Sequence, residues 1–142
     1  MQYKKKYLSI TIIILIIGVI FFSMNNFFES KDNLIILDQI EFDAVYLENE
    51  HMVKVSFKDK TNNTKFAILE ILGMDVTYHQ EYTFDYDSSF IEEVSLQEIP
   101  KYGWKTTPVI LEIQHSEFGK ISLKIEIHDP SESKPKIIVE QK

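Results

Sequence analysis

The hydrophobic pattern of this 142-residue chain changes abruptly near residue 30. From Tyr7 to Met24 there are 18 uncharged residues, and 12 of them are Leu, Ile, Val or Phe. As a helix, this run would be roughly 27 Å long at about 1.5 Å per residue, which nearly matches a bilayer core of about 30 Å. We therefore predict a transmembrane signal-anchor helix over 7–24, followed by a linker over 25–33 and a separate domain over 34–142.

The charges that flank this apolar run predict its orientation. Lys4, Lys5 and Lys6 precede it, whereas Glu29, Lys31 and Asp32 follow it. The positive-inside rule then places residues 1–6 in the cytoplasm and the domain over 34–142 outside the cell membrane. A cleaved signal peptide is the alternative. It is disfavoured because the run exceeds the usual apolar length and no pair of small residues follows it at the spacing that signal peptidase needs.

Beyond the linker, apolar and polar residues alternate with a period of two, which is typical of half-buried strands. The inward-facing residues of the first two strands would be Ile40, Phe42, Ala44, Tyr46, Val53, Val55 and Phe57. A polar turn over Lys60–Thr64 leads into an apolar run over Phe66–Leu72. The spacing of this turn predicts a hairpin between the second and third strands.

An aromatic run over Met74–Tyr86 follows the bend at Gly73. Tyr78, Tyr82, Phe84 and Tyr86 share one parity, so this strand would have an aromatic face and a polar face. We expect Phe84 and Phe90 to be buried.

The clearest hairpin joins Pro108–His115 to Lys120–His128. Its apolar residues occupy odd positions on both strands, so the register requires a three- or five-residue loop or a bulge. Gly119 is the natural left-handed position of that loop. After a Pro- and Ser-containing interruption, a last short strand is predicted over Ile137–Val139.

These elements predict an all-β fold. Seven to nine strands in about 110 residues, without a convincing amphipathic helix, favour an immunoglobulin-like antiparallel β-sandwich preceded by one N-terminal transmembrane helix. A small antiparallel barrel is the alternative.

Composition removes several classes of chemistry. The chain has no Cys, and all 15 basic residues are Lys, so disulfides, thiolate sites and bidentate Arg recognition are excluded. Three Lys and one acidic residue lie in residues 1–30, which leaves 12 Lys against 21 acidic residues beyond them, or −9. Such a charge repels nucleic acid, and none is expected as a partner.

Histidine and carboxylate positions give little sign of a metal or catalytic site. His115 and His128 would lie at opposite ends of the late hairpin, and His51 and His79 stand in polar, solvated contexts. Asp85 and Asp87 begin a stretch that resembles a calcium loop. However, Phe90 and Leu96 occupy the positions that need Gly and a bidentate Glu, so the two Asp residues are only weak calcium candidates.

No Gly-x-Ser-x-Gly elbow and no Gly-rich phosphate loop occur, so we predict a non-enzyme without a cofactor or catalytic residues. Abundant Ile, Lys and Asn suggest a bacterial source. The predicted function is a membrane-anchored extracytoplasmic binding or assembly module that contacts an envelope protein, with Trp104, Tyr102 and Tyr82 as the partner-binding candidates. A calcium- or solute-binding domain and a small hydrolase are the alternatives, and the oligomeric state is left open.

Overall fold

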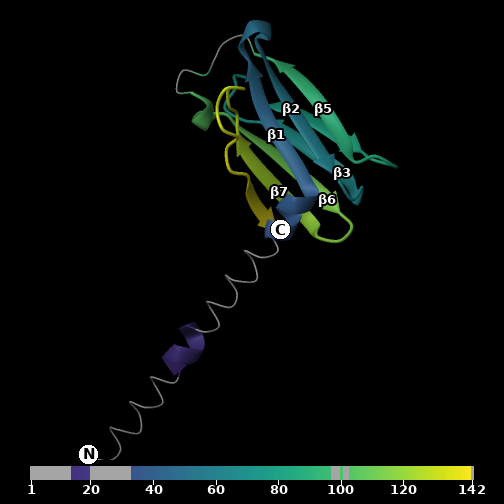
Figure 1. Cartoon of the computed structure of the whole chain (residues 1–142), viewed down its shortest axis with the longest axis vertical. Coiled ribbons are helices and arrows are strands. Elements are labelled where there is room, and N and C mark those ends of the chain that lie inside the picture. The colour runs from purple at the N-terminus through teal and green to yellow at the C-terminus, as the bar shows by residue number, and fades with distance from the viewer. Residues whose placement is uncertain (1–13, 20–32, 97–99, 101–102, 142) are drawn as a thin grey trace, which may run out of the picture. The chain divides into compact units, whose positions relative to one another are not determined.

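A computed structural model describes residues 14–19, 33–96, 100 and 103–141 (Figure 1). The chain divides into two compact units, Met1–Ile35 and Ile36–Lys142. In the first unit, residues 14–19 are helical. The rest of the predicted span over 7–24, the predicted cytoplasmic segment 1–6 and nearly all of the linker 25–33 lie outside the described residues. No helix among the described residues is long and apolar enough to cross a membrane.

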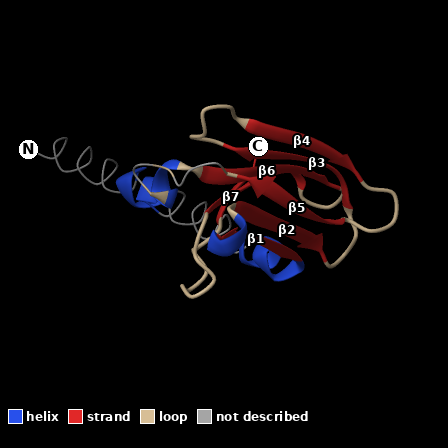
Figure 2. Ribbon diagram, turned by 90° about the horizontal axis from the view of Figure 1, so that it is seen from above, coloured by secondary structure: helices blue, strands red, loops and turns tan. Residues whose placement is uncertain are grey.

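The second unit consists mostly of β-strands in two antiparallel sheets, which Figure 2 shows from above as two layers. The three-stranded sheet has the order β1 (Ile40–Leu47), β2 (Met52–Asp59) and β5 (Ser89–Ser95). The five-stranded sheet has the order β4 (Tyr78–Thr83), β3 (Thr64–Ile71), β6 (Pro108–His115), β7 (Gly119–Glu126) and β8 (Ile138–Gln141). Two short 3-10 helices, η1 (Glu48–Glu50) and η2 (Trp104–Thr106), lie between strands. The all-β prediction is confirmed, and the two sheets form a β-sandwich.

The hydrophobic core lies between the two sheets. Phe42 and Phe57 face each other across β1 and β2, and Ala44 faces Val55 in the same register. All seven residues predicted to face inward on these strands are buried. The period-two pattern therefore identified the inner face of the three-stranded sheet correctly.

The late hairpin also has the predicted register. Leu111 pairs with Leu123 and Ile113 pairs with Ile121, so odd positions face odd positions between β6 and β7. A three-residue loop separates the last pair, His115 and Gly119. Gly119 has a φ of 75°, as the left-handed position in this loop requires.

The predicted hairpin around Lys60–Thr64 is wrong. β2 pairs with β1 and β5, whereas β3 pairs with β4 and β6. The turn therefore carries the chain from one sheet to the other. A five-residue polar turn fits either connection, and the choice depends on the buried Asp59 described below.

The aromatic run forms a shorter strand than the sequence predicts. β4 ends at Thr83, and Phe84 just beyond it is buried with 8% exposure, as expected. Tyr86 is 92% exposed, so its predicted place on the aromatic face is wrong. Once the extended backbone ends, parity no longer determines which way a side chain points.

Two segments outside the strands were not predicted. Residues 33–39 form a short helix, in which Ile36 is fully buried. The predicted second strand of the late hairpin runs to His128, but β7 ends at Glu126. His128 instead forms an isolated parallel bridge with Val45 of β1. This bridge ties the end of the late hairpin to the opposite sheet.

Gly73, in the connection between β3 and β4, is required by its surroundings. Its φ is 79°, and a Cβ at this position would collide with the backbone carbonyl of Thr106. The bend predicted there from sequence is thus held against the segment around η2 by close backbone contact.

Candidate functional site

Glu92, Tyr78 and Tyr82 form a carboxylate clamp that joins the two sheets on the side where β4 and β5 are the edge strands. Glu92 on β5 shares the inward face with Val55, its partner on β2. Its two carboxylate oxygens accept hydrogen bonds from the hydroxyls of Tyr78 and Tyr82 on β4, both at 2.7 Å. An inward-facing charge on an edge strand is a common device against edge-to-edge aggregation.

The clamp raises the pKa of both tyrosine hydroxyls. Burial, together with the hydrogen bond to Glu92 and its negative charge, raises the pKa of Tyr78 to about 12. The same causes raise the pKa of Tyr82 still further. Both hydroxyls are therefore donors at neutral pH, and neither is poised to act as a base or nucleophile.

An aromatic stack packs Tyr82 of the clamp against the core. The ring of Tyr82 lies parallel to that of Phe90, with centroids 4.0 Å apart, and Phe90 lies 5.5 Å from Phe57 in the core. The expected burial of Phe90 is met in part, since its ring is half-buried. One ring face and the hydroxyl of Tyr82 are thus already engaged, so its role as a partner contact stays a prediction.

The other aromatic candidates have different positions. Trp104 is half-buried in η2, and its ring centroid lies 4.7 Å from that of Tyr46 at a tilt of 47°. Trp104 is therefore partly exposed, as expected, but one side of it is packed. Tyr102 lies outside the described residues.

The weak calcium candidates lie in the connection between β4 and β5. Asp85 and Asp87 are exposed, and one oxygen of Asp87 accepts a hydrogen bond from the Ser89 hydroxyl at 2.9 Å. Among the described residues, no group of three or more His, Asp or Glu side chains is arranged to hold a metal ion. Tyr86 between the two Asp residues projects into solvent.

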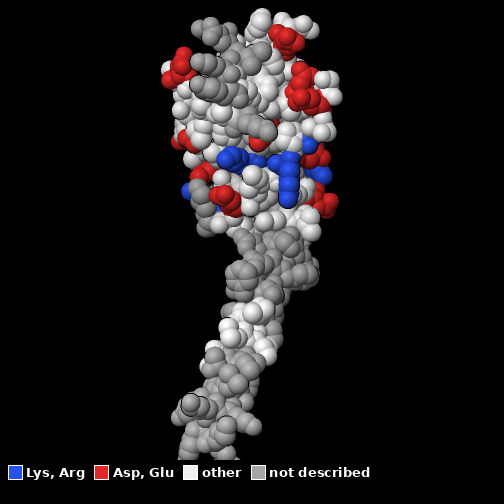
Figure 3. Space-filling model, turned by 90° about the vertical axis from the view of Figure 1, so that its left-hand side faces the viewer, with Lys and Arg blue, Asp and Glu red and all other residues white. Residues whose placement is uncertain are grey.

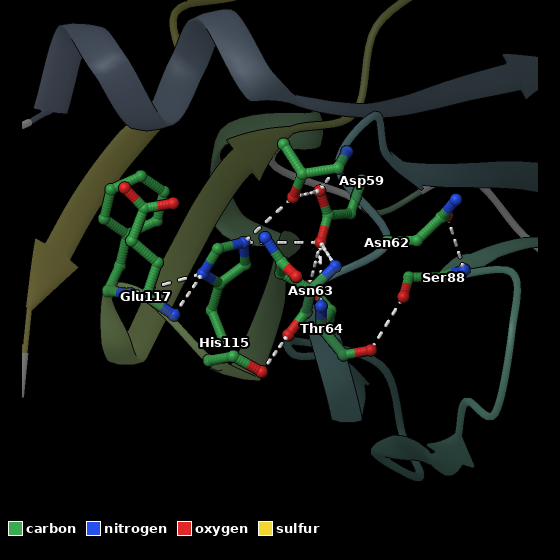
Figure 4. A network of polar contacts seen from close by, with 10 residues as sticks. Asp59, Asn62, Asn63, Thr64, Ser88, His115 and Glu117 are labelled. Atoms are coloured by element: carbon green, nitrogen blue, oxygen red, sulfur yellow. Dashed lines mark hydrogen bonds and ion pairs between the residues drawn. The ribbon is translucent and has the colours of Figure 1, made fainter.

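A second carboxylate, Asp59, lies at the turn between β2 and β3 and is fully buried (Figure 4). One of its oxygens accepts hydrogen bonds from the Thr61 amide at 2.8 Å and the Thr61 hydroxyl at 2.6 Å. The other accepts the amides of Asn63 and Thr64 and the Thr64 hydroxyl, at 2.8 to 2.9 Å. Burial disfavours the charge, but these hydrogen bonds outweigh it and lower the pKa of Asp59 below its ordinary value.

His115 at the end of β6 completes this cluster. Its Nδ1 accepts hydrogen bonds from the amides of Glu117 and Phe118, which leaves the ring proton on Nε2, 3.4 Å from Asp59. The Thr61 hydroxyl also lies 3.4 Å from Nε2. This trio resembles the parts of a hydrolytic site, but the side chains of Asp59 and His115 are both fully buried and cannot reach a substrate.

The other three histidines have separate surroundings, as expected. His128 is buried, with Nε2 3.0 Å from Asp43 and Nδ1 2.9 Å from the carbonyl of Asp129. His51 and His79 are exposed. His79 lies between Glu70 and Glu81, and the hydrogen bond from its ring to Glu70 raises its pKa.

Sequence reasoning missed an apolar stripe on the outer face of the five-stranded sheet. It consists of half-buried residues on β3 and β6 and at their ends, whose parity is opposite to that of the core residues: Phe66, Ile68, Leu72, Pro108 and Ile110. None of the five packs against the core cluster. The signal in the sequence was that β3 and β6 carry apolar residues at both parities, a pattern also expected of strands covered on both faces.

The outer face of the three-stranded sheet is different. Glu41 there faces Lys58, and Lys54 faces Glu93, so opposite charges are paired across its strands. A shallow hollow of about 510 Å³ lies beside Lys58 and Ile91. On the side of the molecule drawn in Figure 3, Lys side chains gather in one band, with Asp and Glu both above and below it.

Comparison with known proteins adds no relative: no family model matches the chain, and no curated protein and no solved structure matches it.

Proposed function

We propose that this protein is a single-pass membrane protein of a bacterial envelope, whose extracytoplasmic β-sandwich is a non-catalytic binding or assembly module. The support for the anchor is the uncharged run over 7–24, with three Lys on one side and acidic residues on the other. The support for a binding role is the sandwich itself, which carries acidic charge and a half-buried apolar stripe on the outer face of its five-stranded sheet.

We further propose that the sandwich is immunoglobulin-like. In that fold strands A, B and E lie in one sheet and C, F and G in the other, with C′ added beside C in variable-type domains. The orders β1-β2-β5 and β4-β3-β6-β7 match this arrangement if β1 to β7 are lettered A, B, C, C′, E, F and G in turn. No described strand takes the place of D, and β8 is an addition beside G.

The observation that carries the non-catalytic assignment is that three buried ionisable side chains are hydrogen-bonded within the fold. Asp59 is bonded to the turn that follows it, His115 to its own loop and to Asp59, and His128 to Asp43 and a backbone carbonyl. Groups that are satisfied internally stabilise the fold and are not free to bind or activate a substrate.

The absence of Cys allows a direct test of the topology in the full chain. Gln2→Cys and Glu93→Cys each introduce a single thiol, one in the predicted cytoplasmic segment and one on an exposed position of β5. In intact spheroplasts, a membrane-impermeant maleimide should label Glu93→Cys and leave Gln2→Cys unlabelled until the membrane is permeabilised.

Labelling of Gln2→Cys with protection of Glu93→Cys would show that the proposed orientation is inverted. If both thiols were protected until permeabilisation, the sandwich would be cytoplasmic. If Glu93→Cys were recovered in the medium with a shortened chain, the segment would be a cleaved signal peptide.

A further inference from the structure

We propose that the outer face of the five-stranded sheet, centred on the apolar stripe, docks a partner protein through a surface that combines apolar residues with Lys or Arg. This inference rests on the proposed function and specifies which surface acts and which chemistry it recognises.

The stripe is continuous across two neighbouring interior strands of the sheet, β3 and β6. Phe66 and Ile68 are two residues apart on β3 and therefore lie on the same face. Ile68 pairs with Glu112 on β6, which makes Ile110 its diagonal neighbour, at a typical distance of about 7–8 Å. Leu72 donates its amide to the Pro108 carbonyl at 3.1 Å, so these two extend the stripe along the sheet.

Acidic residues surround the stripe in register. Ile68 lies between Glu81 on β4 and Glu112 on β6, and Ile110 lies between Glu70 on β3 and Lys124 on β7. In all, the outward positions of this sheet include five Glu and three Lys, with His79 between two of the Glu residues: Glu70, Glu81, Glu112, Glu126, Glu140, Lys65, Lys120 and Lys124. Lys120 lies 3.1 Å from Glu112 and offsets part of that charge.

This charge distribution indicates which kind of partner the outer face of the five-stranded sheet binds. Across an interface, potentials of opposite sign attract and like charges in contact cost several kcal/mol. A second copy of this chain docked face to face would bring together two surfaces in which Glu outnumbers Lys, and an anionic polymer or lipid surface would be repelled. A protein surface with Lys or Arg beside apolar side chains satisfies both the stripe and its acidic border.

Site-specific photo-cross-linking in cells tests the proposal with the full chain. p-Benzoylphenylalanine replaces Ile68 on the proposed face, or Ile91, an exposed residue on the outer face of the three-stranded sheet. Mass spectrometry then identifies the cross-linked peptide. We expect Ile68 to cross-link to a different protein, within a segment in which Lys and Arg outnumber Asp and Glu, at a yield about tenfold above that from Ile91.

A matched pair of charge reversals tests the electrostatic part. Glu81→Lys borders the stripe on edge strand β4, and Glu93→Lys occupies an exposed position on edge strand β5. With the cross-linker at Ile68, Glu81→Lys should lower the yield about tenfold, whereas Glu93→Lys should change it less than about twofold. In the unsubstituted background, a rise in salt should also lower the yield, a readout that does not depend on how the variants fold.

A cross-link from Ile68 to a second copy of this chain, or to a segment with excess Asp and Glu, would overturn the proposal. So would equal losses from the two charge reversals. Cross-linking from Ile91 but not from Ile68 would reject the surface while leaving the binding module intact. If neither Ile68 nor Ile91 gave a cross-link, the result would reject the proposal and count against the proposed function itself.

Discussion

Asp59 and Glu92 each join the two sheets of the sandwich, but the donors that meet them differ. Asp59 is fully buried and accepts three backbone amides and two hydroxyls. Glu92 is half-buried on edge strand β5 and accepts two tyrosine hydroxyls. The buried amide of Thr64 has no other acceptor if the carboxylate of Asp59 is lost, whereas hydroxyls near the surface can turn to water. The same functional group should therefore contribute very differently to stability at the two places.

The sharpest way to test this difference is to remove Asp59. Asp59→Ala leaves the amides of Asn63 and Thr64 without their acceptor and His115 without its neighbour, so we expect a loss of about 4 kcal/mol in the free energy of unfolding. Denaturant unfolding followed by the fluorescence of Trp104, the single Trp, measures it. The control is Asp87→Ala, which should stay within about 0.5 kcal/mol of the parent. Equal effects at the two positions would contradict the assignment.

The pH dependence of stability gives a second test at Asp59. Because the pKa of Asp59 is lower in the folded state, its contribution is fully present above the unfolded value of about 3.9 and is lost as pH falls below it. Asp59→Asn should therefore flatten the acid limb of the stability curve. An acid limb as steep as that of the parent would assign the acid sensitivity to other carboxylates.

A smaller loss is expected at the clamp. Glu92→Gln keeps one carbonyl acceptor for the two tyrosines, so the free energy of unfolding should fall by about 1 kcal/mol. The matched control is Glu93→Gln, the next residue on the same strand, with its side chain on the exposed face. A loss at Glu92 as large as that at Asp59→Ala would remove the proposed contrast between the two carboxylates.

The smallest effect should appear at alkaline pH. Tyr78 has a pKa raised to about 12, so the stability from its protonated hydroxyl is complete below about pH 10 and is lost as pH rises toward 12. In a tyrosinate absorbance titration, Tyr78→Phe should remove a late-titrating group and not an early one. The reverse assignment would mean that the clamp is open in solution.

Strands with one buried and one solvent-exposed face were predictable from sequence, because burial places their apolar residues at every second position. Phe42 and Val55 follow this rule, and Gly119 marks the late loop because few other residues accept its backbone angle. The connection between β2 and β3 was not predictable, since its path depends on contacts from Asp59 to residues beyond the turn. The stripe was missed because Ile68 and Leu69 are alike in polarity, so alternation carries no information along β3.

The bridge between Val45 and His128 affects the order in which the fold can form. The Tyr46 amide donates to the His128 carbonyl at 2.9 Å, and the His128 amide donates to Ala44 at 3.1 Å. These contacts join segments that are more than eighty residues apart, so closing them is slow compared with forming local hairpins. While the ribosome makes the chain, this edge of β1 has no partner until the segment around His128 has emerged. Until then, the unpaired backbone groups of this edge can pair with strands of neighbouring nascent chains. Chaperones would therefore act on the chain at this late stage, before the edge of β1 is paired.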